Sequence, residues 1–174
     1  MVNLLNNSNF MRKLITTLLC SLMLLCEAHI IMCSNAAYGF SQNYDVRTKS
    51  DITAEQLDAK LQNRLKGTGC YFIAAQEKYG INAEFLAAIA IHESGNGSST
   101  AARRKNNFFG LMGKRGQLSF SSPQECIDCV AKNLTKPSGY YFGRGRYTIS
   151  SIGRKYASDK RWSARVVATM KSIR

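Results

Sequence analysis

Acidic residues are scarce in this chain. Its 174 residues include 11 Asp and Glu against 24 Lys and Arg, a formal net charge of +13, and no acidic residue lies between Glu93 and Glu125. Such an excess favours an anionic polymer as a partner, although a high net charge also serves solubility alone. No zinc-finger or RNA-binding signature is present, which argues against nucleic acid. The composition therefore points to an anionic partner other than nucleic acid.

Metal-ligating residues are also few. His92 is the only histidine after residue 37, and the cysteines in that part of the chain are Cys70, Cys126 and Cys129. An odd number of cysteines excludes a fully paired disulfide framework. The Cys126-x-x-Cys129 pair has no second pair and no histidine at ligand spacing, so we interpret it as packing and predict no metal site and no cofactor.

The chain has one long hydrophobic run, at its N-terminus. Arg12 and Lys13 precede an uncharged stretch from Leu14 to Cys26, and Ser34-x-Ala36 is a plausible cleavage pattern. The stretch is shorter than the roughly 20 residues of a spanning helix. We predict that residues 1–37 are the signal peptide of a secreted protein. An uncleaved membrane anchor is the alternative. An exported protein meets the anionic polymers of a cell wall first, and these become the expected partners.

For the rest of the chain, the sequence predicts a polar linker over 38–50 and one domain over 51–174. Capping residues and apolar spacing predict helices, and Gly113 to Gly116 predicts the turn of a small hairpin. The expected helices cover about 53–65, 70–79, 82–94, 98–104, 122–134 and 148–156, with a last helix capped by Asp159; the expected strands cover 108–112 and 117–120.

One helix ends in an acid. Apolar residues at 85, 86, 89 and 90 form a buried stripe, and Glu93 is the next step along it. Burial and the negative end of the helix dipole both disfavour an anion at this position. A carboxyl group that stays protonated is what a general acid for glycoside cleavage needs. The alternative is a solvated glutamate at a helix end.

An ordered set of motifs extends this hypothesis over nearly all of 51–174. The set comprises Glu93-Ser-Gly-Asn-Gly97, Lys105-Asn-Asn-Phe-Phe-Gly110, Phe120-Ser-Ser-x-x-Glu125, Pro137 with Tyr140-Tyr141, and Tyr156-Ala-Ser-Asp-Lys-Arg-Trp162. The region resembles the glucosaminidase family of bacterial cell-wall hydrolases, glycoside hydrolase family 73. The resemblance implies a mainly α, lysozyme-like helical domain with one small β-hairpin lobe. It also implies hydrolysis of peptidoglycan glycan strands on the reducing side of N-acetylglucosamine, with Glu93 as general acid. We expect the protein to be a monomer.

The resemblance nominates further site residues. Tyr140 or Tyr141 matches a loop tyrosine near the family's site, where a phenol can hydrogen-bond the substrate's acetamido group; packing is the alternative. Many relatives have Trp where Asn96 stands, so a stacking contact is absent or supplied elsewhere. Three further pairs are candidates for substrate binding. We expect Asn106 and Asn107 to turn the chain and brace the cleft, and we expect one of Phe108 and Phe109 in the core and the other on the floor of the cleft. Arg144 and Arg146 are expected either to bind substrate carboxylates or to be solvated loop residues.

A second catalytic carboxylate is not obvious. Family members often place one in the hairpin lobe, whereas the hairpin tip here is Lys114-Arg115. Glu125 is a candidate, but its position also suits helix capping. We therefore hypothesise that Glu93 works as the sole acid, while the substrate's own acetamido oxygen stabilises the oxocarbenium-like centre.

Other functions fit parts of the pattern. A muramidase or lytic transglycosylase of the lysozyme superfamily also places Glu-Ser at a helix end, and would cut on the other side of the disaccharide. A non-catalytic wall-binding module fits the missing hairpin carboxylate and Asn96. A basic nucleic-acid binder predicts salt-dependent DNA binding.

Overall fold

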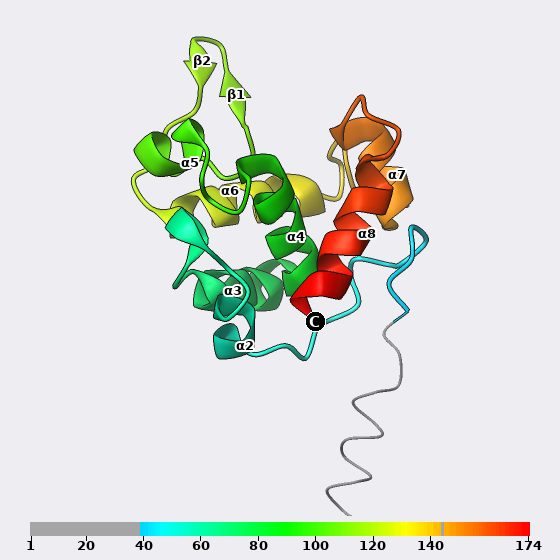
Figure 1. Cartoon of the computed structure of the whole chain (residues 1–174). Coiled ribbons are helices and arrows are strands. Elements are labelled where there is room, and N and C mark those ends of the chain that lie inside the picture. The colour runs from blue at the N-terminus through cyan, green and yellow to red at the C-terminus, as the bar shows by residue number, and fades with distance from the viewer. Residues whose placement is uncertain (1–38, 144) are drawn as a thin grey trace, which may run out of the picture. The chain divides into compact units, whose positions relative to one another are not determined.

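Helices dominate the part of the chain that the computed structural model describes, residues 39–143 and 145–174. Residues 40–174 form one unit (Figure 1). Its elements are α2 (Ala54–Asp58), the 3-10 helix η1 (Asn63–Leu65), α3 (Gly69–Tyr79), α4 (Ala83–Ser94), α5 (Thr100–Lys105), β1 (Met112–Gly113), β2 (Gly116–Gln117), α6 (Pro123–Thr135), α7 (Ile149–Tyr156) and α8 (Trp162–Ile173). The predicted class, mainly α with one small hairpin, is confirmed.

Helix α4 is the centre of the core. The side chain of Asn82 caps its first turn by accepting a hydrogen bond from Phe85 N at 2.8 Å. Every residue from Ala83 to Ala90 is buried. Gly95 ends the helix in the left-handed conformation, with φ 58°. The predicted helix and its cap are therefore confirmed, and its C-terminal end is the first part to leave the core.

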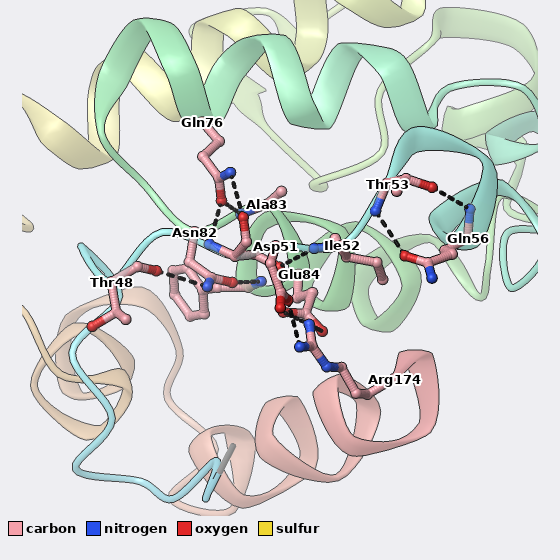
Figure 2. A network of polar contacts seen from close by, with 12 residues as sticks. Thr48, Asp51, Ile52, Thr53, Gln56, Gln76, Asn82, Ala83, Glu84 and Arg174 are labelled. Carbon is pink, nitrogen blue, oxygen red and sulfur yellow. Dashed lines mark hydrogen bonds and ion pairs between the residues drawn. The ribbon is translucent and has the colours of Figure 1, made fainter. Parts of the chain in front are cut away.

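Helix α8 runs antiparallel along α4, and polar contacts join the two helices at both ends. At one end, Arg174 Nη1 lies 3.3 Å from Glu84 Oε2, and the Glu84 side chain is fully buried (Figure 2). Ser50 Oγ donates to the same carboxylate at 2.5 Å, and Arg174 also pairs with Asp51. At the other end, Trp162 Nε1 donates to Glu93 Oε1 at 2.9 Å. The register of α8 on α4 is thus set by contacts at both ends.

The hairpin is present but shorter than expected. Met112 pairs with Gln117 and Gly113 with Gly116, whereas residues 108–111 form no strand. The side chain of Asn107 connects the two sides of the hairpin where backbone pairing is missing. Its Nδ2 donates to the carbonyls of Leu111 and Leu118 at 2.9 and 3.0 Å. This amide fixes the base of the hairpin to the segment that follows α5.

Residues 40–50 are not a linker, which corrects the expectation for 38–50. Val46 is fully buried and Phe40 is 3% exposed. Val46 N donates to Tyr147 O at 2.9 Å, and Asn82 N donates to Val46 O at 2.7 Å. The segment has no hydrophobic period because it pairs through one β-bridge, between Asp45 and Thr148, rather than through a helix or a sheet.

The single helix expected over 53–65 is also divided, into α2 and η1. Gln62, between the two helices, has φ −129° and ψ 171°, an extended conformation that a continuous helix does not allow. Leu57, Leu61 and Leu65 are nevertheless all buried, as their spacing predicts. The predicted signal peptide or anchor, residues 1–37, lies outside the described residues. Within 39–174, no helix is long and apolar enough to cross a membrane.

Candidate active site

Glu93 lies half-buried in the last turn of α4. Its Oε1 accepts the hydrogen bond from Trp162 Nε1, and Trp162 itself is 2% exposed. No second hydrogen bond to this carboxyl group is found among the described residues. One oxygen is thereby fixed by a buried indole, and the other has no hydrogen-bond partner among the described residues. This arrangement suits an acid that must transfer a proton to a bound molecule.

A row of four aromatic side chains in contact with one another leads away from Glu93: Trp162 and Tyr156 are stacked, Tyr156 and Tyr141 are tilted, and Tyr141 meets Tyr140 edge to face. The Trp162 ring stacks on Tyr156 with centroids 4.9 Å apart, Tyr156 lies 5.7 Å from Tyr141, and Tyr141 lies 5.3 Å from Tyr140. Tyr140 is 61% exposed. We call Trp162, Tyr156, Tyr141 and Tyr140 the aromatic row. Exposed aromatic faces at the end of such a row can pack against the apolar faces of a sugar.

The hydroxyl of Tyr156 is the one buried side-chain polar atom without a hydrogen-bond partner in the described part of the chain. Burial raises the pKa of this phenol well above its usual range, and the nearby charge of Glu93 raises it further. The group therefore remains an uncharged phenol. A buried hydroxyl with no partner costs free energy, and a ligand that hydrogen-bonds it would recover that cost.

A pocket of about 430 Å³ lies beside the row. Its wall is formed by α6, by the loop after α6, by Tyr156 and by Leu111 at the base of the hairpin. The pocket therefore joins the hairpin side of the molecule to the aromatic row. Its size is in the range of small-ligand sites.

Arg146 holds the loop that carries Tyr140 and Tyr141. Its Nη2 donates to Tyr140 O at 2.7 Å and its Nε donates to Tyr141 O at 3.1 Å. The guanidinium thus braces the backbone of the aromatic row, and its proposed contact with substrate carboxylates stays a prediction. Arg144 lies outside the described residues.

Three asparagines nominated for substrate binding hold backbone segments. Asn96 Oδ1 accepts from Gln62 N at 3.1 Å, which ties the start of η1 to the end of α4. Asn106 donates to Phe120 O at 3.0 Å and adopts the left-handed conformation that ends α5. Asn107 braces the hairpin. These contacts agree with the bracing role expected for Asn106 and Asn107, and substrate contact by the three stays a prediction.

Both phenylalanines of the Asn-Asn-Phe-Phe-Gly motif are buried. Phe108 is fully buried and Phe109 is 3% exposed. The expectation that one of them lines the cleft is therefore wrong. The residues do not alternate as in a strand, because this segment turns inward against α6, where Cys126 is buried beside the Phe108 backbone. Burial raises the pKa of the Cys126 thiol to about 12, which agrees with packing rather than reactivity.

Glu125 caps α6. Its Oε2 accepts from both Ser121 N and Ser121 Oγ at 2.7 Å, while its own N donates to Ser122 Oγ at 3.1 Å. The hydrogen bonds from the Ser121 hydroxyl and backbone lower the pKa of this exposed carboxyl group. It is therefore ionised at neutral pH and unsuited to donate a proton. A catalytic role for Glu125 has no support in these contacts.

Two residues of the site were not nominated from the sequence, Trp162 and Tyr156. Trp162 lies in the apolar stripe of the last helix, a pattern that indicates core packing. Both residues delimit the Tyr156-Ala-Ser-Asp-Lys-Arg-Trp162 motif. That motif was the signal that could have identified them.

Known proteins resemble this chain in sequence and in fold. Residues 69–174 match the family described as "Glucosaminidase: Mannosyl-glycoprotein endo-beta-N-acetylglucosaminidase". A protein of Streptococcus pneumoniae serotype 4, named putative endo-beta-N-acetylglucosaminidase, is 30% identical over 143 residues, which cover 74% of this chain and 21% of that protein. The chain thus spans about a fifth of the length of this relative.

Two crystal structures of S. aureus autolysin E share the fold. A catalytic mutant in complex with the disaccharide NAG-NAM has a TM-score of 0.65 at 24% identity, covering 76% of this chain and 71% of that chain. A complex with the muropeptide NAM-L-Ala-D-iGlu has a TM-score of 0.62 at 24% identity, with the same coverage. The likeness confirms the predicted lysozyme-like helical domain with its small hairpin.

Proposed function

This chain belongs to the glucosaminidase family, and from that premise we propose that it hydrolyses peptidoglycan at the β-1,4 bond on the reducing side of N-acetylglucosamine. One observation carries the proposal. Glu93 is a half-buried acid at the end of a buried helix, fixed by a single indole N–H at the head of an aromatic row. S. aureus autolysin E, which shares the fold, binds NAG-NAM and a muropeptide, and this supports the same class of substrate.

In the first step, protonated Glu93 donates its proton to the glycosidic oxygen while the bond from that oxygen to C1 breaks. The carbonyl oxygen of the sugar's own acetamido group bonds to C1 from the opposite face, so that a cyclic oxazolinium ion carries the positive charge. The sugar on the reducing side, N-acetylmuramic acid with its peptide, leaves.

In the second step, water attacks C1 and gives its proton to the Glu93 carboxylate. The oxazolinium ring opens, the acetamido group is restored and the acid is regenerated. The two displacements retain the anomeric configuration. A phenol both donates and accepts hydrogen bonds, so Tyr156 can hold the acetamido group and turn its carbonyl oxygen toward C1.

The choice of an internal nucleophile follows from the carboxylates. The sequence has none between Glu93 and Glu125, and the carboxylate of Glu125 is engaged by Ser121. A two-carboxylate mechanism with a fixed water therefore lacks its second member in this lobe. Retention of configuration supports the proposed mechanism, and inversion contradicts it.

The bond that is cut can be identified from the products. Purified peptidoglycan is digested with the protein, the new reducing ends are reduced with borohydride, and the sugars are separated after acid hydrolysis. We expect glucosaminitol. Muramitol would indicate a muramidase, anhydromuramic acid a lytic transglycosylase, and the absence of any new end a binding module; each of these results overturns the proposal.

The substrate lies outside the cytoplasm, so we also propose that residues 1–37 export the protein to the wall, where its basic charge favours anionic polymers. Cell fractionation tests this. Recovery of the protein from the wall or the medium supports export, and recovery from the cytoplasm alone contradicts it.

A further inference from the structure

The hairpin lobe, defined as α5 with β1, β2 and the segments that join them (residues 100–120), carries charge of only one sign. Its charged residues are Arg103, Arg104, Lys105, Lys114 and Arg115. Four of them are exposed and Lys105 is partly exposed. The dipole of α5 favours cations in its last turn and explains part of the set. It does not explain Lys114 and Arg115, which form the turn between the strands.

None of the five cations forms an ion pair with a described residue. Elsewhere in residues 39–174, six cations do: Arg47, Lys49, Lys78, Arg161, Arg165 and Arg174. Two adjacent cations at a tip repel each other unless an anion lies between or beside them. The lobe therefore presents a positive surface that no described residue neutralises.

The lobe is held in a fixed shape by its own hydrogen bonds. Phe120 N donates to Lys105 O at 2.9 Å, and Leu118 N donates to Leu111 O at 3.0 Å. Lys105 Nζ reaches Gln117 O at 3.5 Å, and the Asn107 amide joins the two strands at their base. A surface that is ordered in advance loses little entropy when it binds a partner.

The lobe also borders the site. The short segment 95–99 joins the lobe to the end of α4 that carries Glu93, and Leu111 at the base of the hairpin forms part of the same pocket wall as Tyr156. Figure 1 shows α4 between the hairpin and α7. An extended substrate bound at Glu93 therefore has the lobe on one side.

We propose that the hairpin lobe binds the carboxylates of the peptides that substituted glycan strands carry, so that acidic, peptide-bearing strands are cut in preference to strands whose carboxylates are neutral. This inference rests on the proposed function. The sugar that leaves from the reducing side bears the peptide, which places negative charge next to the scissile bond. Lys114 and Arg115, whose side chains have no hydrogen bond among the described residues, are the residues best placed to meet it.

The test compares two forms of one substrate with the unmodified protein. Amino groups of purified strands are acetylated, and the carboxylates of half the material are then converted to amides with carbodiimide. We expect kcat/KM to be about fivefold higher on the acidic strands at low salt, because several exposed pairs each contribute modestly. The ratio should approach one at 0.5 M NaCl, since exposed charges are screened.

Two double variants test whether the preference for acidic strands depends on the hairpin lobe. The double substitution Lys114→Gln with Arg115→Gln should cut both substrates at the rate that the unmodified protein shows on amidated strands. The control, Lys66→Gln with Lys171→Gln, removes the same charge from exposed positions outside the lobe and should keep the fivefold preference.

The outcomes separate the two proposals. Equal cutting of both substrates by the unmodified protein overturns the inference and leaves the proposed function standing. Failure to cut either substrate overturns the proposed function. If the double variant loses activity only on walls that retain phosphodiester polymers, the lobe binds those polymers and the peptide assignment is wrong.

Discussion

At the scale of the residue, few contacts hold the Glu93 side chain in place. Its single described hydrogen bond comes from Trp162, and the Trp162 ring lies on Tyr156, whose hydroxyl has no partner among the described residues. The stability of the protein gains nothing from that unsatisfied hydroxyl. Function is the simplest reason for a phenol there, because phenylalanine would pack as well.

Replacing Tyr156 with Phe separates the effect of the hydroxyl on stability from its effect on activity. The change deletes only a hydroxyl that has no partner among the described residues, so we expect the free energy of unfolding to stay equal or rise by up to about 1 kcal/mol. Activity on peptidoglycan should fall by about tenfold, since a hydrogen bond to the substrate is lost. Thermal unfolding and initial rates measure the two effects. Unchanged rates would remove Tyr156 from the site.

Replacing Trp162 with Phe tests the positioning of Glu93. Phenylalanine keeps a ring against Tyr156 but cannot donate to Glu93 Oε1. A hydrogen bond to a charged group contributes about 1.5–3 kcal/mol, so we expect kcat to fall roughly 10- to 100-fold with KM little changed. A rise in KM at constant kcat would show that Trp162 binds substrate instead of holding the acid.

At the scale of the element, the antiparallel pair of α4 and α8 positions the site. Arg174 contacts Glu84 at the start of α4, and Trp162 contacts Glu93 at its end. The two helices have twelve residues each, a length of about 18 Å at 1.5 Å per residue. Polar contacts at both ends therefore fix how far α8 slides along α4, and with it the place of the indole donor.

Replacing Arg174 with Ala should destabilise the protein by about 3 kcal/mol, because the fully buried Glu84 loses its cation. Lys171→Ala, on the exposed side of the same helix, should change the free energy of unfolding by less than about 0.5 kcal/mol. Urea unfolding of both variants gives the comparison. Equal stabilities would mean that the contact between Arg174 and Glu84 does not stabilise the fold.

Elements with strong local signals could be predicted from the sequence. Helix α4 has a capping asparagine, continuous apolar residues and a terminal glycine, and its structure agrees with them. The strands over 108–112 and 117–120 were predicted too long, since the burial of Phe108 and Phe109 against α6 cannot be read from local alternation. The Glu93 to Trp162 contact joins residues 69 positions apart. The spacing of residues within one helix cannot predict a contact between residues so far apart in the sequence.

At the scale of the whole molecule, the folded unit begins before the stretch that matches the family. That match starts at residue 69, yet Phe40 and Val46 are buried and Ser50 donates to Glu84. The polar, aperiodic sequence of residues 38–50 predicts a linker, and residues 40–50 are the part of it that belongs to this unit. The two buried apolar side chains and a β-bridge nevertheless make them part of the core.

A chain that starts at residue 51 should therefore be much less stable than one that starts at residue 39. It loses the burial of Phe40 and Val46, about 1.5–3 kcal/mol for each, as well as the Ser50 hydrogen bond to Glu84. We expect its melting temperature to be lower by about 10 °C or more. Equal melting temperatures would restore the linker interpretation.

The variant Glu93→Gln tests whether Glu93 is the catalytic acid. Glutamine has nearly the same shape and keeps an oxygen for the Trp162 indole, so the melting temperature should change little. Release of reducing ends from purified peptidoglycan should fall by about 10²- to 10⁴-fold, because the proton donor is gone. Release at the rate of the unmodified protein would contradict the account.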